Sequence, residues 1–307
     1  MTILDFLVII NPRARRAGRV DRAALAAPWS ARGVTEVVLS ASRDHAAALC
    51  EQAVTAGAKA IIVVGGDGSA NAAAGQLLGS NTALAVVGAG TTNVFARSIG
   101  VPRDPLAASA SLAQGWAAGR RHLIPVGRAN KAVFLANAGV GLDAAVVRRV
   151  EAAPRAKRFS GHGWFLAAAL LESGGARRPN LSVGIVTEGG EAVGPTATSF
   201  LAALRTGPYT FIGPRPLHLS PGSDLRRGLH AVQLAPRDRW ALARAAAAAL
   251  TANGPSSALV ARHDSVKVID ITAAEPAPYQ VDGEFVGTSM HLRIELHPDR
   301  LWLLRPS

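Results

Sequence analysis

A glycine-rich turn between a buried strand and a helix, within residues 60–74, constrains this chain more than any other stretch. Residues 61–64 are a continuous apolar run, which predicts a strand buried on both faces. The turn at 65–69 reads GGDGS, and glycine lets backbone N–H groups approach an anion closely. We expect Ser69 to cap the following helix, whose N-terminal dipole favours a phosphate. The stretch predicts a phosphate and metal site around Asp67; glycines that serve only an ordinary βα turn are the alternative.

The first hundred residues repeat this strand–turn–helix order. The expected strands are 3–10, 36–39, 61–64 and 84–87, with helices between them near 20–28, after 44 and after 69. This alternation predicts a parallel sheet with helices on both faces, a Rossmann-like α/β domain. Ligands bind such sheets at the carboxyl ends of the strands. Polar or glycine residues follow all four strands, which favours a binding site there.

The second half of the chain has the pattern of a β-rich antiparallel sandwich domain. Short strand-like runs separated by turn signals recur, and helices are expected near 141–172 and 240–250. The expected strands are 122–126, 132–136, 181–187, 198–204, 229–234, 265–272 and 279–281. We therefore predict one domain at 1–124 and a second at 125–307, in which the last segment, about 290–307, can pack back on the first domain.

Composition narrows the class of protein. The chain has 307 residues, 49% hydrophobic and 5% aromatic, and a net charge of +12 that comes mainly from arginine. Such a charge suits an anionic surface or a nucleotide phosphate, or reflects codon bias, whereas the scarcity of aromatic residues disfavours nucleic acid. A single cysteine, Cys50, excludes an intrachain disulfide and favours a reducing compartment. The apolar start reads as a strand rather than a signal peptide, and no run is long enough to cross a bilayer.

Five motifs in order carry a family resemblance. They are NP at 11–12, GGDGS at 65–69, GTTNVFAR at 90–97, GVGLDA at 139–144 and VDGE at 281–284. In this order and spacing the chain resembles the diacylglycerol kinase catalytic family, which includes bacterial lipid kinases and the sphingosine and ceramide kinases. The resemblance implies an ATP-dependent kinase that uses Mg²⁺ and phosphorylates a lipid hydroxyl, its α/β and β-rich domains facing each other across the nucleotide cleft.

The resemblance also implies roles for individual residues. Asp67 would hold the Mg²⁺–phosphate network, and Glu284 would be the general base. The residues implied to bind ATP are Asn11, Pro12, Arg13, Ala14, Arg15, Ser40, Gly65, Gly66, Asp67, Gly68, Ser69, Asn71, Gly90, Thr91, Thr92 and Asn93. Phosphoryl transfer needs phosphate positioning, charge neutralisation and a base near the hydroxyl, and these residue types can supply all three. For Glu284 the alternative is an exposed acid after an Asp-Gly hairpin turn, in which Asp282 only forms the turn.

The chain also departs from the family pattern. Val94 stands where bacterial diacylglycerol kinases usually carry an Asp, Ala73 replaces a usual Glu, and Arg15 replaces a usual Gly. The segment at 226–230 reads RRGLH instead of a DDG–LD pattern that binds a structural Mg²⁺, so we predict that this metal site is absent. Sphingosine and ceramide kinases lack the same acids, which gives a slight lean toward a ceramide or sphingoid substrate.

Residues 147–172 place basic residues before aromatic and aliphatic ones. This order suits an element that docks on an anionic leaflet, with a core helix preceded by a solvated basic approach as the alternative. We expect a cytoplasmic protein, peripheral at the inner face of the membrane, whose partners are a membrane lipid substrate and an anionic surface but not nucleic acid. A homodimer is left open. The competing functions are an NAD kinase-like enzyme and a catalytically silent regulator that binds lipid or nucleotide.

Overall fold

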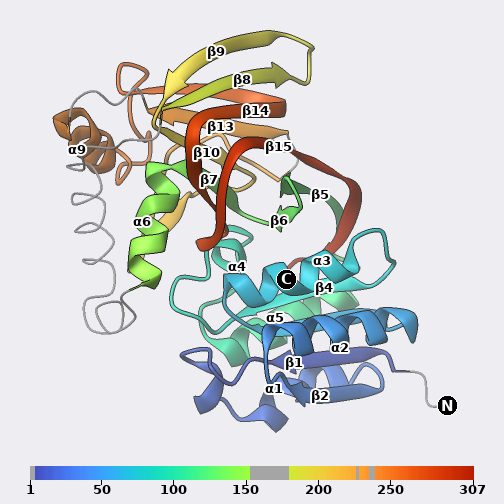
Figure 1. Ribbon diagram of the computed structural model, residues 1–307. Coiled ribbons are helices and arrows are strands. Elements are labelled where there is room, and N and C mark those ends of the chain that lie inside the picture. The colour runs from blue at the N-terminus through green and yellow to red at the C-terminus, as the bar shows by residue number, and fades with distance from the viewer. Residues whose placement is uncertain (1–3, 153–179, 226–227, 235–238) are drawn as a thin grey trace. The chain divides into compact units, whose positions relative to one another are not determined.

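The computed structural model describes residues 4–152, 180–225, 228–234 and 239–307. It divides into two compact units: Met1–Val126 together with Pro298–Ser307, and Gly127–His297. The sequence places the boundary after residue 124, and in the structure the first unit's main segment ends at Val126. Figure 1 shows an α/β first part and a β-rich second part, which confirms the predicted fold class.

The first unit is built on a parallel sheet of four apolar strands. Their order is β4–β3–β1–β2, and every residue of β1, β3 and β4 is buried. The strands are β1 (Phe6–Ile10), β2 (Thr35–Leu39), β3 (Ala60–Gly65) and β4 (Ala83–Gly88). The four predicted strands are therefore confirmed to within a few residues. Trp302 and Leu303, near the end of β15 (Glu284–Leu304), add a further parallel pairing beside β4.

Helices cover both faces of this sheet, as right-handed crossovers require. In Figure 1 α2 and α3 lie side by side on one face, and α1 packs with α5. Trp29 of α1 donates from Nε1 to the Ser109 hydroxyl of α5 at 2.9 Å. The helical elements are α1 (Arg22–Ser30), α2 (Arg43–Thr55), α3 (Asp67–Leu77), α4 (Val94–Ser98), α5 (Pro105–Ala117) and the 3₁₀ helix η1 (Ala17–Arg19).

The start of α3 differs from the prediction. The helix begins at Asp67, and its N-cap, Gly66, makes no side-chain cap hydrogen bond. Ser69 lies inside the first turn, where its N–H already donates to the Gly66 carbonyl at 3.1 Å. The prediction of Ser69 as the cap is wrong, because the glycines let the chain enter the helix three residues earlier.

In the second unit four antiparallel strands pair in a closed cycle, and one of them is long and bent. β14 (Val260–Val281) pairs with β13 (Leu229–Leu234) near its start and with β7 (Asn137–Gly141) near its end. β10 (Phe200–Leu204) joins β13 to β7, which completes the cycle. Val140, Leu201, Ala231 and Ile269 belong to the apolar core of this unit. The predicted β-rich antiparallel character is confirmed, and β14 is the strand that connects its layers.

The remaining elements extend this unit. β5 continues from the first unit and pairs with β6, and β8 pairs with β14 and β9. The elements are β5 (Arg121–Ala129), β6 (Ala132–Phe134), α6 (Leu142–Glu151), β8 (Leu181–Thr187), β9 (Ala192–Thr198), β11 (Thr210–Ile212), β12 (Arg215–Leu217) and α9 (Arg239–Ala248). The sequence analysis did not predict β7, β9, β11, β12 or β15. In β7 and β9 the glycine, alanine and proline residues have little intrinsic strand preference.

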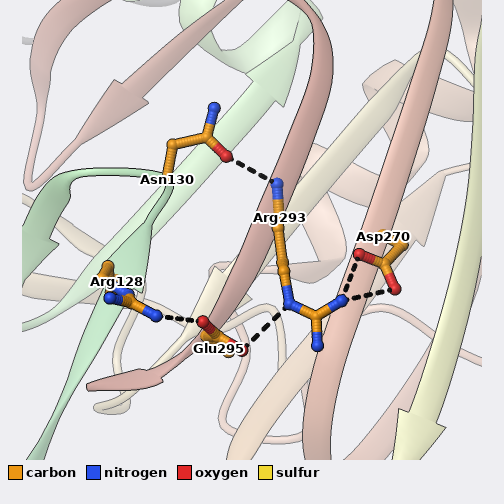
Figure 2. A network of polar contacts seen from close by, with 5 residues as sticks. All are labelled: Arg128, Asn130, Asp270, Arg293 and Glu295. Atoms are coloured by element: carbon orange, nitrogen blue, oxygen red, sulfur yellow. Dashed lines mark hydrogen bonds and ion pairs between the residues drawn. The ribbon is translucent and has the colours of Figure 1, made fainter. Parts of the chain in front are cut away.

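A polar network holds β15 against its neighbours in the second unit (Figure 2). Arg293 donates from Nη1 to both oxygens of Asp270 on β14, at 3.0 and 3.2 Å, and from Nε to Glu295 at 3.0 Å. Arg128 of β5 bonds the other oxygen of Glu295, and its guanidinium lowers the pKa of that carboxyl. Asn130 accepts from the Arg293 backbone N–H at 2.9 Å. Because the network is partly exposed, it fixes strand register more than it stabilises the fold.

Two sequence expectations fall on residues that the structure does not describe. They concern most of the basic–aromatic segment at 147–172 and the pair at 226–227. Among the described helices none is long and apolar enough to cross a membrane.

Burial raises the pKa of the Cys50 thiol to about 12, so this thiol stays protonated and unreactive at neutral pH.

The contact between α5 and the C-terminal strand can be tested at one glycine. A methyl group on Gly115 would meet the Arg305 carbonyl oxygen at 2.0 Å, whereas one on Gly75 of α3 would meet nothing within 4 Å. We expect Gly115→Ala to lower the free energy of unfolding by about 1–3 kcal/mol through overpacking. Gly75→Ala is the matched control and should raise it by about 0.5–1 kcal/mol. Urea unfolding of both variants measures the difference; equal effects would contradict the packing described.

Candidate functional site

Two glycine turns meet at the carboxyl ends of β3 and β4. The Gly65 carbonyl accepts from the N–H groups of Ala89 at 2.7 Å and of Gly90 at 3.2 Å. A Cβ on Gly90 would lie 2.8 Å from the Gly66 Cα, and one on Gly65 would lie 2.6 Å from the Ser69 side chain. The two turns touch through bare backbone, which any larger residue would push apart.

Asp67 connects these two turns. Its Oδ2 accepts from the N–H of Val94 at 2.9 Å and its Oδ1 accepts from the N–H of Phe95 at 3.0 Å. These N–H groups open helix α4 and have no partner within the helix. Asp67 therefore holds the GTTN turn as well as supplying a carboxylate. Val94 contributes a backbone donor where the family pattern has an acid.

Asn93 shapes the second turn from within. Its backbone is left-handed, with φ of 51°, a conformation that asparagine tolerates better than most residues. Its amide oxygen accepts from the Gly90 N–H at 2.8 Å, and its amide nitrogen donates to the Gly90 carbonyl at 3.0 Å. The side chain thus closes the turn that leaves Thr91 exposed and Thr92 half-buried.

Asn11 brings the end of β1 to the same place. Its amide nitrogen donates to the Ser69 hydroxyl at 3.0 Å, and its amide oxygen accepts from the N–H of Arg13 at 3.0 Å. The NP turn and the GGDGS turn are therefore joined by a direct side-chain contact. The structure thus brings together the predicted residues at the ends of β1, β3 and β4.

The other predicted residues of the first unit lie around this centre. Ser40 is buried at the end of β2, with its N–H 2.9 Å from the Ile10 carbonyl. Asn71 is buried on α3 and its amide oxygen accepts from Arg43 of α2 at 3.1 Å, so it acts between helices. The surface residues of the NP turn are Pro12, Arg13 and Arg15, which are exposed, and Ala14, which is half-buried.

The turns fit an anion, and Asp67 fits a hard cation. The N-cap of α3, Gly66, makes no side-chain cap hydrogen bond, and a helix N-terminus of this kind suits a phosphate. Mg²⁺ in such sites binds one or two carboxylates plus substrate phosphates. In the part of the chain that the structure describes, no group of three His, Cys, Asp or Glu side chains could hold a metal ion. An ion at Asp67 would therefore depend on phosphate oxygens.

Glu284 lies in the second unit, directly after a two-residue hairpin turn. Val281 of β14 pairs with Glu284 of β15, and the turn residues Asp282 and Gly283 have φ of 49° and 81°. Two positive φ angles are typical of a type I′ turn, for which Asp-Gly is favoured. Glu284 is half-buried and is the first residue after the predicted Asp-Gly hairpin turn.

Asp282 does more than form this turn. Its carboxylate accepts three backbone N–H groups, from Leu135 at 2.8 Å, Ala136 at 2.7 Å and Asn137 at 3.1 Å. Its own N–H donates to the Asn137 carbonyl at 2.8 Å. The turn that carries Glu284 is thus fixed to the segment between β6 and β7.

A buried side-chain network lies behind the turn. Gln280 donates to Asn137 Oδ1 at 3.0 Å and to Asp143 Oδ2 at 2.8 Å, while its amide oxygen accepts from the Gly283 N–H at 2.8 Å. The Tyr209 hydroxyl donates to the other Asp143 oxygen. Burial raises the pKa of the Asp143 carboxyl, and the two donors oppose that shift. Gly139 is required here, since a Cβ would lie 1.4 Å from Asp143 Oδ2.

Sequence reasoning missed Gln280 and Tyr209 and gave Asp143 no role of its own. Asp143 stands in the GVGLDA motif, so its position was visible, but nothing nearby in the sequence indicates its partners. Tyr209 and Gln280 lie 66 and 137 residues from it. Only the closed strand pairing brings them together.

His230, in the segment where we predicted the loss of a structural metal site, makes an ordinary polar contact. The side chain is buried, and its Nδ1 lies 2.7 Å from Asp264 Oδ1. The carbonyls of Leu225 and Gly228 accept from the buried Arg205 guanidinium at 2.7 and 2.9 Å. A protein cation thus bonds the backbone on both sides of 226–227.

Comparisons with known proteins agree with the motif resemblance. Residues 5–120 match the family model of the diacylglycerol kinase catalytic domain. Curated proteins named diacylglycerol kinase from two strains of Mycobacterium tuberculosis are 38% identical over 87 residues, which is 28% of this chain and 28% of theirs. The resemblance to diacylglycerol kinases is therefore confirmed for the α/β domain, and the match spans less than a third of these relatives' length.

Solved structures are similar over nearly the whole fold. A protein described as a candidate diacylglycerol kinase from Bacillus anthracis aligns with a TM-score of 0.75 at 19% identity, covering 99% of this chain and 98% of its own. Another structure of a diacylglycerol kinase from the same organism gives a TM-score of 0.68 at 17% identity, with 98% and 96% covered. At this identity the comparison establishes the fold of both units.

Each carboxylate oxygen of Asp67 accepts one backbone N–H group of α4. We therefore expect the protein to lose stability when one of these two acceptors is replaced. Asp67→Asn replaces one acceptor by an amide donor that faces a backbone N–H, so we expect the free energy of unfolding to fall by about 1–2 kcal/mol. Asp21→Asn is the matched control, because Asp21 caps α1 through Oδ1 alone and asparagine caps equally well. Urea unfolding compares the two; equal losses would refute the two-oxygen clamp.

The buried Asp143 predicts a pH-dependent contribution to stability. Because its pKa is raised in the folded state, the fold holds the proton more tightly than the unfolded chain does. Its contribution is therefore present at low pH and is lost as pH rises through the folded pKa. As the pH rises above 3.8, the ordinary pKa of this carboxyl, we expect the unfolding free energy of the wild type to fall relative to that of Asp143→Asn.

Glu275→Gln, at an exposed position of β14, serves as the control for this pH series and should follow the wild type. Urea unfolding at each pH gives the slopes. Parallel curves for Asp143→Asn and the wild type would mean that Asp143 titrates normally in the folded protein.

Proposed function

We propose that this protein, whose residues 5–120 match the diacylglycerol kinase catalytic domain, is an ATP-dependent lipid kinase. It transfers the γ-phosphate of ATP to a hydroxyl group of a membrane lipid. The observation that carries the proposal is that this match covers the joined turns of Asn11, Asp67 and Asn93. A family match and an anion-binding geometry coincide there.

The first unit would bind the nucleotide. Phosphoryl transfer asks little covalent chemistry of the protein and depends on positioned phosphates and neutralised charge. The N–H groups of the turns at 65–69 and 90–93 suit the phosphates, and the NP turn and Ser40 complete the predicted ATP site. Mg²⁺, when bound with the phosphates, would neutralise charge that develops in transfer, and Asp67 is the residue that would hold it.

Glu284 would accept the proton from the lipid hydroxyl. A general base must be held in a defined place and remain accessible. The hydrogen bonds of Asp282 and Gln280 restrain the turn before it, and Glu284 itself is half-buried. These features support the base in preference to a solvated hairpin acid.

The acceptor is a diacylglycerol or a ceramide or sphingoid lipid, with a slight lean toward the second. Val94, which offers only its backbone N–H to Asp67, supports the lean, since sphingosine and ceramide kinases also lack an acid there. The name of the curated relatives supports diacylglycerol. We propose further that the protein is cytoplasmic and docks peripherally on an anionic leaflet, which its net charge of +12 favours.

Transfer of labelled phosphate from ATP with Mg²⁺ to a panel of micellar lipids tests the proposal. The panel contains diacylglycerol, ceramide, sphingosine and monoacylglycerol, with NAD as a soluble acceptor. Labelled ceramide or sphingosine would support the sphingolipid lean, and labelled diacylglycerol would replace it. Label on NAD would indicate an NAD kinase-like enzyme, and label on nothing would favour a silent regulator.

Glu284→Gln keeps the shape of the side chain and removes the base. We expect kcat on the best lipid to fall by about 10²–10⁴-fold, with ATP affinity unchanged. Glu275→Gln on β14 is the matched control and should retain wild-type turnover. A Glu284→Gln enzyme with full activity would remove Glu284 from the mechanism without affecting the assignment of the nucleotide site.

A further inference from the structure

A buried arginine lies against the segment that departs from the family's metal-binding pattern. Arg205 comes directly after β10, and its side chain is fully buried, with 0% exposed. Its guanidinium donates from Nη2 to the Leu225 carbonyl at 2.7 Å and from Nη1 to the Gly228 carbonyl at 2.9 Å. One side chain therefore binds the backbone at both ends of the stretch that leads into β13.

The residues at this place do not fit a hard cation such as Mg²⁺. Such an ion takes carboxylate and carbonyl oxygens, whereas the sequence has arginine at both 226 and 227, and arginine carries donors only. His230 stands at the last acid of the pattern, and its Nδ1 lies 2.7 Å from Asp264 Oδ1. The two carbonyls that a metal ion could use accept from Arg205. The protein itself supplies positive charge here.

The segment that Arg205 binds also packs closely on its surroundings. A Cβ on Gly207, two residues after Arg205, would lie 2.9 Å from the Ser223 hydroxyl oxygen. A Cβ on Gly228 would lie 2.7 Å from Glu188 Oε1 and 3.0 Å from a carbonyl oxygen of β14. The chain before β13 is therefore held between the loop after β10 and β14, and Arg205 places a cation inside this contact.

The backbone of Arg205 leads to the turn that carries Glu284. The N–H groups of Arg205 and Thr206 donate to the Ala136 carbonyl at 2.8 and 3.4 Å. The Ala136 N–H donates to Asp282 Oδ1 at 2.7 Å, and Asp282 is the first residue of the turn before Glu284. A path of hydrogen bonds thus runs from the segment before β13, through Arg205, to this turn.

We propose that in this chain Arg205 takes the place of the structural metal ion and is a positioning residue for the turn that carries Glu284. A buried charge is costly unless it is hydrogen-bonded, so the guanidinium keeps its carbonyl partners in place. Arginine stays charged and no chelator removes it, whereas the occupancy of a metal site depends on the ion in solution. The positioning role rests on the proposed function of Glu284, and the replacement of the metal does not.

The melting temperature of the full chain without nucleotide tests the replacement. We expect the wild type to melt within about 1 °C in EDTA and in millimolar Mg²⁺ or Ca²⁺, because an ion that binds only the folded state raises this temperature. Arg205→Met removes the donor of two carbonyls and should melt lower. Arg205→Lys, a single compact ammonium, should fall between the two. Stabilisation of the wild type by either ion, or an unchanged Arg205→Met, would overturn the replacement.

Amide hydrogen exchange and kinetics test the positioning role in Arg205→Lys. We expect the amides of 135–137, which Asp282 binds, to exchange about tenfold faster or more relative to those of β8. On the best lipid kcat should fall about tenfold or more, with KM for ATP within about twofold. Arg215→Lys, exposed on β12, is the matched control and should behave as the wild type in both measurements.

Unchanged exchange at 135–137 in Arg205→Lys would refute the path through Ala136. Faster exchange with unchanged kcat would show that Arg205 supports the fold without positioning Glu284. Melting and exchange need neither ATP nor lipid, so both are read even when the transfer assay finds no kinase. In that case the proposed function fails, and the replacement of the metal is judged on melting alone.

Discussion

The contact between two glycine turns, locked by one carboxylate, is the constraint on which the first unit depends. Gly66 and Gly90 approach so closely that a side chain on Gly90 would displace the other backbone. Asp67 then spans the junction by accepting the first two N–H groups of α4. When two strand ends form one binding site, they must lie close together, and their side chains must leave room for the ligand. Glycine allows the close approach and leaves that room, and Asp67 joins the two turns.

The second unit solves a similar problem with buried polar groups. A hairpin turn forms easily, but its position is poorly fixed when only its own two strands contact it. Here Asp282 takes three backbone N–H groups of another segment, and Gln280 links the turn to Asp143. These hydrogen bonds stabilise one geometry of the turn that carries Glu284. The buried acid makes that stability sensitive to pH.

Most of the fold could be predicted because the strongest signals are local. The runs at 61–64 and 84–87 identify buried parallel strands without ambiguity, and their glycine turns mark the site edge. Some of the errors occur where local preference is weak. β7 consists of small residues and forms because β10 and β14 pair with it on both sides. Ser69 resembles a helix cap in sequence, yet Gly66 takes that position.

What the sequence determined by itself is the alternation of the first domain, the β-rich second part, and the residues Asn11, Asp67, Asn93 and Glu284 as the centre of interest. Tertiary structure decided what those residues do to one another. Asp67 acts as a clamp on α4, and the Asp143 network supports the Glu284 turn across more than a hundred residues of chain. The physical reason is that strand formation follows from hydrophobic periodicity over neighbouring positions, whereas hydrogen bonds between distant side chains exist only once the pairing of strands has set their separation.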